Sequence, residues 1–173
     1  MLVLLVRHGH AGTKRQWRGD DSARPLDKQG LAEAAALVHS LAPFEPARII
    51  SSPFLRCVQT VTPLSESLGI RIECSQSLVP EAGAAATLLA REVSVDGPGA
   101  VVLCTHGEVI HDMQTRLAPD GDAGGAGGAD FGDFGPASLR EKGSVWVLER
   151  TEGRFTAARH LLPPPSPVEP PAD

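Results

Sequence analysis

Two unbroken apolar runs stand out in the pattern of apolar and polar positions along the chain. The first covers residues 2–6 (LVLLV), and the second covers residues 100–105 (AVVLCT). Each run has about the length of a β-strand, and a strand covered by helices on both faces shows such continuous apolar character instead of alternation. We therefore predict that the two runs form adjacent central strands of a mostly parallel sheet.

Shorter apolar segments alternate with stretches of helical composition along the rest of the chain. Further strands are predicted at residues 48–52 and 70–74, followed by a terminal hairpin formed by residues 144–149 and 154–160. Helices are predicted at residues 31–41 with Asp27 as N-cap, at 53–68 with Pro53 in the first turn and Gly69 at the end, at 84–92 and at 108–117. This alternation predicts an α/β fold, a three-layer α/β/α sandwich around the sheet.

We expect one globular domain over residues 1–162. Residues 118–137 hold seven of the 18 glycines and are predicted to be a flexible loop, and residues 163–173 form a proline-rich tail. No apolar run approaches the roughly 20 residues that span a bilayer, and the N-terminal run is too short for a signal peptide. Cys57, Cys74 and Cys104 lie in apolar segments without paired spacing. We expect them to be reduced and buried, in a cytoplasmic protein.

Charge is unevenly distributed along the chain. The net charge is −5, yet residues 1–60 carry eight Lys/Arg against five Asp/Glu, which leaves −8 for the remainder. The acidic total argues against a nucleic-acid partner. The basic first third is compatible with a local binding site for a small anion.

Three of the predicted strands end in polar groups that suit phosphate chemistry. Arg7-His8-Gly9 follows the first run, Arg56 follows the 48–52 strand, and His106-Gly107 follows the second central run. Ligands of parallel sheets bind beyond the carboxyl ends of the strands, so these groups converge if the strands are neighbours. Two guanidinium groups bind a tetrahedral oxyanion, and a neutral histidine between them can attack phosphorus.

A phosphatase reaction also requires a carboxylic acid to protonate the leaving oxygen and then activate water. Glu81, which follows Pro80 in an irregular segment, is the first candidate, and Asp21 in the long polar loop after the first strand is the second. Arginines lower the pKa of a nearby carboxyl group, whereas a general acid needs a raised pKa. This consideration favours Glu81.

The motifs RHG, SSPFLRCVQT and THG, in this order after apolar strands, resemble the histidine phosphatase superfamily, which includes phosphoglycerate mutases. The segment DDSARPLDKQG is similar to the compact SixA-type phosphohistidine phosphatases. GTKRQWRGDDSARPLD also resembles the phosphatase-like domain attached to some bacterial MutT-type Nudix hydrolases. The resemblance covers residues 2–111, most of the globular part.

The resemblance implies a role for each matching residue. His8 would be the nucleophile, Arg7 and Arg56 would hold phosphate, and His106 would be the second catalytic histidine. Glu81 in LVPEA falls where larger members place a catalytic glutamate. We expect further substrate contacts from Gly9, Lys14, Asp21, Arg24 and Gly107. The substrate would be a small phosphorylated molecule or a phosphohistidine protein, and the reaction calls for no cofactor and no metal.

The same residues are compatible with two other functions. His8, His10 and His106 with an aspartate could bind a divalent metal ion and form a metal-dependent hydrolase, although two neighbouring arginines would repel the cation. Alternatively, the basic corner could be a non-catalytic phosphate-binding module. Hydrolysis of a generic phosphate ester that persists in the presence of a chelator distinguishes the three hypotheses.

Overall fold

The computed structural model describes residues 1–117, 141–151 and 154–163, and these form three α/β/α layers. The strands are β1 (Leu2–Arg7), β2 (Pro46–Ser51), β3 (Ile72–Cys74), β4 (Ala100–Thr105), β5 (Val145–Thr151) and β6 (Arg154–Leu161), in the sheet order β3-β2-β4-β1-β5-β6. The first four in this order pair in parallel, whereas β5 and β6 are antiparallel. The predicted mostly parallel sheet and its terminal hairpin are therefore confirmed.

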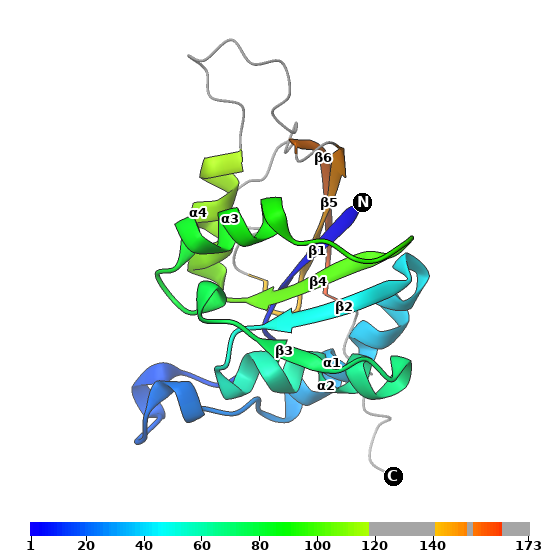
Figure 1. The fold of residues 1–173 in the computed structure, drawn as a ribbon. Helices are drawn as coiled ribbons and strands as arrows, with labels where there is room; N and C mark the ends of the chain where they lie inside the picture. The colour runs from blue at the N-terminus through cyan, green and yellow to red at the C-terminus, as the bar shows by residue number, and fades with distance from the viewer. Residues whose placement is uncertain (118–140, 152–153, 164–173) are drawn as a thin grey trace.

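Helices cover both faces of this sheet. They are α1 (Lys28–Leu41), α2 (Leu55–Leu68), α3 (Gly83–Glu92) and α4 (Gly107–Leu117). In Figure 1, α1 and α2 lie on one face, and α3 and α4 lie on the other. The arrowheads of β2 and β4 point to the same edge of the sheet, which is also the edge where the loop between β1 and α1 lies.

The two apolar runs are adjacent central strands, as predicted. β1 pairs with β4 in register from Leu2↔Ala100 to Arg7↔Thr105. Val3 and Leu5 pack into the core beneath α3 and α4, whereas Leu4 and Val6 pack into the core beneath α1 and α2. All four side chains are buried, and burial of each stabilises the fold by about 1.5–3 kcal/mol. Because both faces are covered, the strand shows no polar alternation.

The helix boundaries confirm both predicted caps and correct one prediction. Asp27 caps α1 by accepting a hydrogen bond from the Gly30 amide. Gly69 ends α2 with a left-handed φ of 66°. Pro53, however, is not in the first turn of α2, which begins at Leu55 with the extended Phe54 as N-cap. Pro53 lies in the connection from β2, where the Ser52 hydroxyl accepts a hydrogen bond from the Phe54 amide at 3.4 Å.

The expectation for the cysteines is only partly correct. All three are free, and Cys57 and Cys104 are buried, but Cys74 is exposed. Cys74 ends β3, which lies at one edge of the sheet, so one of its sides has no neighbouring strand to cover it.

The glycine-rich loop 118–137 and residues 164–173 of the predicted tail lie outside the described residues. Among the residues that the structure describes, no helix is both long enough and apolar enough to cross a membrane.

Candidate active site

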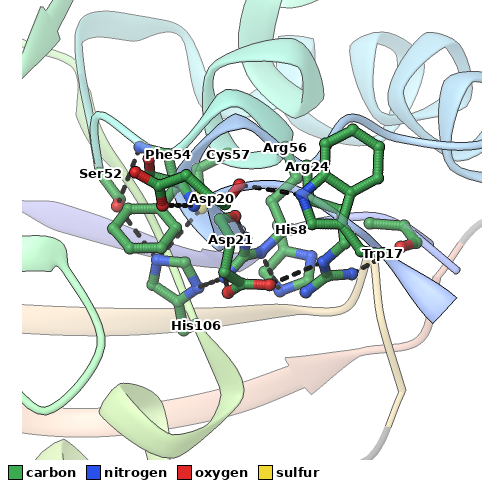
Figure 2. A network of polar contacts seen from close by, with 12 residues as sticks. His8, Trp17, Asp20, Asp21, Arg24, Ser52, Phe54, Arg56, Cys57 and His106 are labelled. Atoms are coloured by element: carbon green, nitrogen blue, oxygen red, sulfur yellow. Dashed lines mark hydrogen bonds and ion pairs between the residues drawn. The ribbon is translucent and has the colours of Figure 1, made fainter. Parts of the chain in front are cut away.

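Three strand ends bring their polar residues together at one edge of the sheet. His8 follows β1, His106 follows β4, and Arg56 lies in the first turn of α2. The two imidazole centroids are 5.3 Å apart, and Arg56 makes a hydrogen bond to each ring. Figure 2 shows the three side chains in one polar network. The predicted convergence of His8, Arg56 and His106 is therefore present.

The hydrogen bonds of His8 determine which ring nitrogen can react. Nδ1 lies 2.8 Å from the carbonyl oxygen of Gly9, and because a carbonyl only accepts, Nδ1 carries the proton. Nε2 then has a free electron pair, toward which Arg56 Nε donates at 3.3 Å. Burial lowers the pKa of His8 well below its ordinary value, and the nearby His106, Arg56 and Arg7 lower it further. His8 is thus a neutral imidazole with Nε2 available as a nucleophile.

Arg56 connects the histidines with the loop that follows β1. Its guanidinium is only 3% exposed. Nη1 donates to the Asp21 carbonyl at 2.7 Å, and Nη2 donates to the Asp21 carboxylate and to His106 Nδ1, both at 3.2 Å. A planar fork with several donors in this position can bind two oxygens of a phosphoryl group.

His106 is oriented by groups on both sides of its ring. Because Arg56 donates to Nδ1, Nε2 carries a proton, and it lies 3.0 Å from Ser52 Oγ and 3.6 Å from Cys57 Sγ. Burial opposes ionisation of the Cys57 thiol, but hydrogen bonds with Cys104 and His106 outweigh it and lower the pKa of Cys57. These neighbours hold His106 in one orientation at this edge of the sheet.

Arg7 and Gly107 lie against each other. A Cβ atom at Gly107 would stand 2.7 Å from Arg7 Cζ and 2.8 Å from Arg7 Nε. A side chain at position 107 would therefore displace the Arg7 guanidinium, which is the far end of a flexible side chain. This contact directs Arg7 along the N-terminus of α4, which itself favours anions.

Replacement of Gly107 by alanine is expected to displace the Arg7 guanidinium. Because the sequence analysis assigns Arg7 to phosphate binding, we expect kcat/KM to fall about tenfold to a hundredfold, with a loss of about 1 kcal/mol in the free energy of unfolding. Steady-state kinetics and urea unfolding measure the two effects. Unchanged kinetics would show that Arg7 does not bind the substrate.

The two candidate acids have different surroundings. Asp21 forms ion pairs with Arg24 at 2.8 Å and with Arg56 at 3.2 Å. Burial opposes its ionisation, but the hydrogen bond from Arg24 and the charges of Arg56, Arg24 and Lys14 outweigh it and lower the pKa of Asp21. Asp21 is therefore ionised and suited to positioning the arginines, not to donating a proton.

Glu81 is exposed and has a positive φ of 69°, a conformation that is uncommon for a residue other than glycine. Its segment is tied to the catalytic edge, because Thr105 Oγ1 donates at 2.7 Å to the carbonyl of Leu78. Thr105 immediately precedes His106. The structure thus brings the loop that carries Glu81 to the end of β4.

The other predicted substrate contacts are distributed around this centre. Gly9 donates its amide to Thr60 Oγ1 at 3.0 Å, which fixes the chain just after His8. Arg24 is buried and donates to the Ala11 carbonyl in addition to Asp21. Lys14 is exposed in the loop and interacts electrostatically with Asp21.

The arrangement of His10 does not favour the metal-site hypothesis. His10 Nδ1 contacts the Asp27 carboxylate, and its amide donates to Glu33 Oε2 at 2.7 Å. His8 and His106 are instead bridged by a cation, Arg56. In the part of the chain that the structure describes, no three His, Cys, Asp or Glu residues are grouped to hold a metal ion.

Lys142 is a cation near the site that the sequence analysis did not select. The neighbouring Gly143 donates its amide toward the carbonyls of Arg7 at 3.2 Å and His8 at 3.3 Å. Burial lowers the pKa of Lys142, and the charges of Arg7 and Arg24 lower it further. The sequence alone carries no signal for Lys142, because only the antiparallel pairing of β5 with β1 brings residues just before β5 to the end of β1.

Known proteins share this sequence pattern. Residues 3–82 match the model of the histidine phosphatase superfamily, branch 1. The 8-oxo-(d)GTP phosphatase of Mycolicibacterium smegmatis is 35% identical over 171 residues, which cover 94% of this chain and 48% of that protein. The chain therefore spans about half the length of the curated relative that it matches.

Solved structures share the fold. The protein histidine phosphatase SixA complexed with tungstate aligns with a TM-score of 0.70 and 21% identity, over 94% of this chain and 97% of its own. A mycobacterial glucosyl-3-phosphoglycerate phosphatase in complex with VO3 aligns with a TM-score of 0.63 and 18% identity, over 92% and 96% of the two chains. The order of the motifs, their meeting at one sheet edge and the family model agree, and residues 3–82 of the chain match the histidine phosphatase superfamily, branch 1.

Proposed function

We propose that the domain is a phosphatase that hydrolyses a phosphate monoester or phosphoramidate through a phosphohistidine intermediate on His8. The observation that carries the proposal is the state of His8, whose protonated Nδ1 faces the Gly9 carbonyl and whose Nε2 faces Arg56. A buried, neutral imidazole beside a guanidinium has both the nucleophile and the charge that a phosphoryl group needs.

The reaction then proceeds in two displacements. His8 Nε2 forms a bond to phosphorus while the bond from phosphorus to the leaving atom breaks and that atom takes a proton. Water subsequently attacks phosphorus, the N–P bond breaks, a proton leaves the water, and inorganic phosphate and neutral His8 result. Arg7, Arg56 and His106 stabilise the charge on the phosphoryl oxygens in both steps.

We assign the proton transfers to Glu81, with Asp21 holding Arg56 and Arg24 in place. An activated aryl ester needs little protonation of its leaving group, whereas an alkyl phosphate needs much. Glu81→Gln is therefore expected to slow hydrolysis of the alkyl ester about a hundredfold and that of the aryl ester by much less. If Asp21→Asn alone shows this selectivity, the role passes to Asp21; if neither variant does, neither carboxyl group donates the proton.

The relatives suggest two substrate groups to test. The curated relative is named for 8-oxo-(d)GTP, and the SixA structure is named for protein phosphohistidine. We propose a screen of nucleotides, small phosphate esters and a phosphohistidine peptide, each with and without a chelator. Turnover that persists with chelator supports the proposal. Turnover that the chelator abolishes supports a metal-dependent hydrolase, and binding without turnover supports a phosphate-binding module.

A further inference from the structure

A small cavity of ≈ 220 Å³ lies in the loop between β1 and α1. Its apolar walls come from Ala11, Trp17, Pro25 and Leu26, and Gln16 and Arg24 add polar groups. Pockets for complete drug-sized ligands are about 300–1,000 Å³. The cavity therefore suits a single ring system and not a whole nucleotide.

Trp17 is a rigid and accessible wall of this cavity. It is 38% exposed, whereas Trp146, the other tryptophan of the chain, is 1% exposed. The indole Nε1 donates to the Asp20 carbonyl at 2.9 Å. A Cβ atom at Gly19 would lie only 3.3–3.4 Å from the indole ring. The hydrogen bond to Asp20 and the packing against Gly19 thus hold the indole ring in place. The exposed part of the ring is a pre-organised surface for stacking.

The carboxylate of Asp21 connects the cavity with Arg56, one of the proposed phosphate-binding residues. Arg24 lines the cavity and donates to Asp21 Oδ1 at 2.8 Å, while Asp21 Oδ2 contacts Arg56 Nη2 at 3.2 Å. In Figure 2, Trp17 lies at the Arg24 end of the network, and His106 lies at the opposite end. The Arg24–Asp21–Arg56 network therefore joins the cavity to the side chains that surround His8.

We propose that this cavity seats the base of a nucleoside phosphate while its phosphate lies against His8 and Arg56. The proposal rests on the phosphatase function proposed above and names its substrate class. Stacking on Trp17 holds the base. Gln16 presents its amide NH2 group to the base, because its Oε1 already accepts a hydrogen bond from Thr13 at 2.8 Å.

Guanosine 5′-monophosphate and ribose 5-phosphate test the proposal, because both release the same primary alcohol and differ in the base. We expect the kcat/KM of the nucleotide to exceed that of the sugar phosphate about tenfold or more. Trp17→Ala should remove this preference, and Trp17→Phe should retain most of it. The matched control is Leu88→Ala, an exposed position on α3, which should leave the preference unchanged. Equal kcat/KM for the two esters in the unmodified protein would overturn the proposal.

A second measurement separates this inference from catalysis. Guanosine, which lacks a phosphate, should quench the fluorescence of the unmodified protein, whereas the Trp17→Phe variant, which retains only Trp146, should show no quenching. Quenching supports the base site even if neither ester is hydrolysed, an outcome that would overturn only the phosphatase proposal. Absence of quenching, or quenching only by a phosphohistidine peptide, would overturn the nucleotide assignment.

Discussion

Replacement of His8 by alanine is expected to reduce kcat by at least about a thousandfold. In the proposed mechanism Nε2 of this ring forms the bond to phosphorus, and alanine has no nucleophile that could form a covalent intermediate in its place. His8 is also buried at the end of β1, so the variant loses some packing, which we expect to cost about 1–2 kcal/mol of unfolding free energy. Single-turnover kinetics and urea unfolding separate the two effects.

The matched control for this variant is His39→Ala. His39 is an exposed histidine in the last turn of α1, and its removal should leave kcat within about twofold. If the His8 and His39 variants have similar activity, catalysis does not proceed through His8.

Arg56→Ala is expected to lower kcat/KM by about a hundredfold to a thousandfold, since one charge-assisted clamp of the transition state is worth several kcal/mol. Arg56→Lys should recover little of this loss, because a single ammonium cannot bridge His8, His106 and Asp21 as the guanidinium fork does. The loop after β1 also loses an anchor, because Arg56 donates to the Asp21 carbonyl. We expect about 1–2 kcal/mol less stability.

Arg48→Ala provides the comparison for Arg56. Arg48 lies in β2 and forms a half-exposed ion pair with Glu73 at 2.7 Å. Its removal is expected to change the unfolding free energy by about 0.2–1 kcal/mol and to leave kcat/KM unaffected. Similar kinetic losses in the Arg48 and Arg56 variants would indicate that loss of folded protein, not of a phosphate clamp, explains both.

The sequence pattern was sufficient to predict the centre of the fold and of the site. The runs at β1 and β4 are apolar at every position because helices cover both faces, and this pattern identifies a central parallel strand without knowledge of its neighbours. Once β1, β2 and β4 are adjacent, His8, Arg56 and His106 must meet beyond their carboxyl ends. Periodicity and strand-end position therefore predicted these three side chains.

Features that depend on long-range packing were not predictable in this way. Arg24 belongs to a polar loop in the sequence, yet it is buried because Asp21 and the Ala11 carbonyl satisfy its donors. Lys142 approaches the site only because β5 runs antiparallel beside β1. The start of α2 depends on the local turn at Pro53 and not on helix propensity. Each result follows from a partner distant in sequence or from turn geometry, which composition does not encode.

Trapping of the covalent intermediate tests the central claim most directly. The protein is mixed with a phosphate ester labelled in its phosphoryl group, quenched in alkali within one turnover, and digested for peptide mapping. We expect an acid-labile, alkali-stable label on the peptide that contains His8, present in the unmodified protein and in His39→Ala but absent from His8→Ala. Turnover without label on this peptide, or label that persists in His8→Ala, would contradict nucleophilic catalysis by His8.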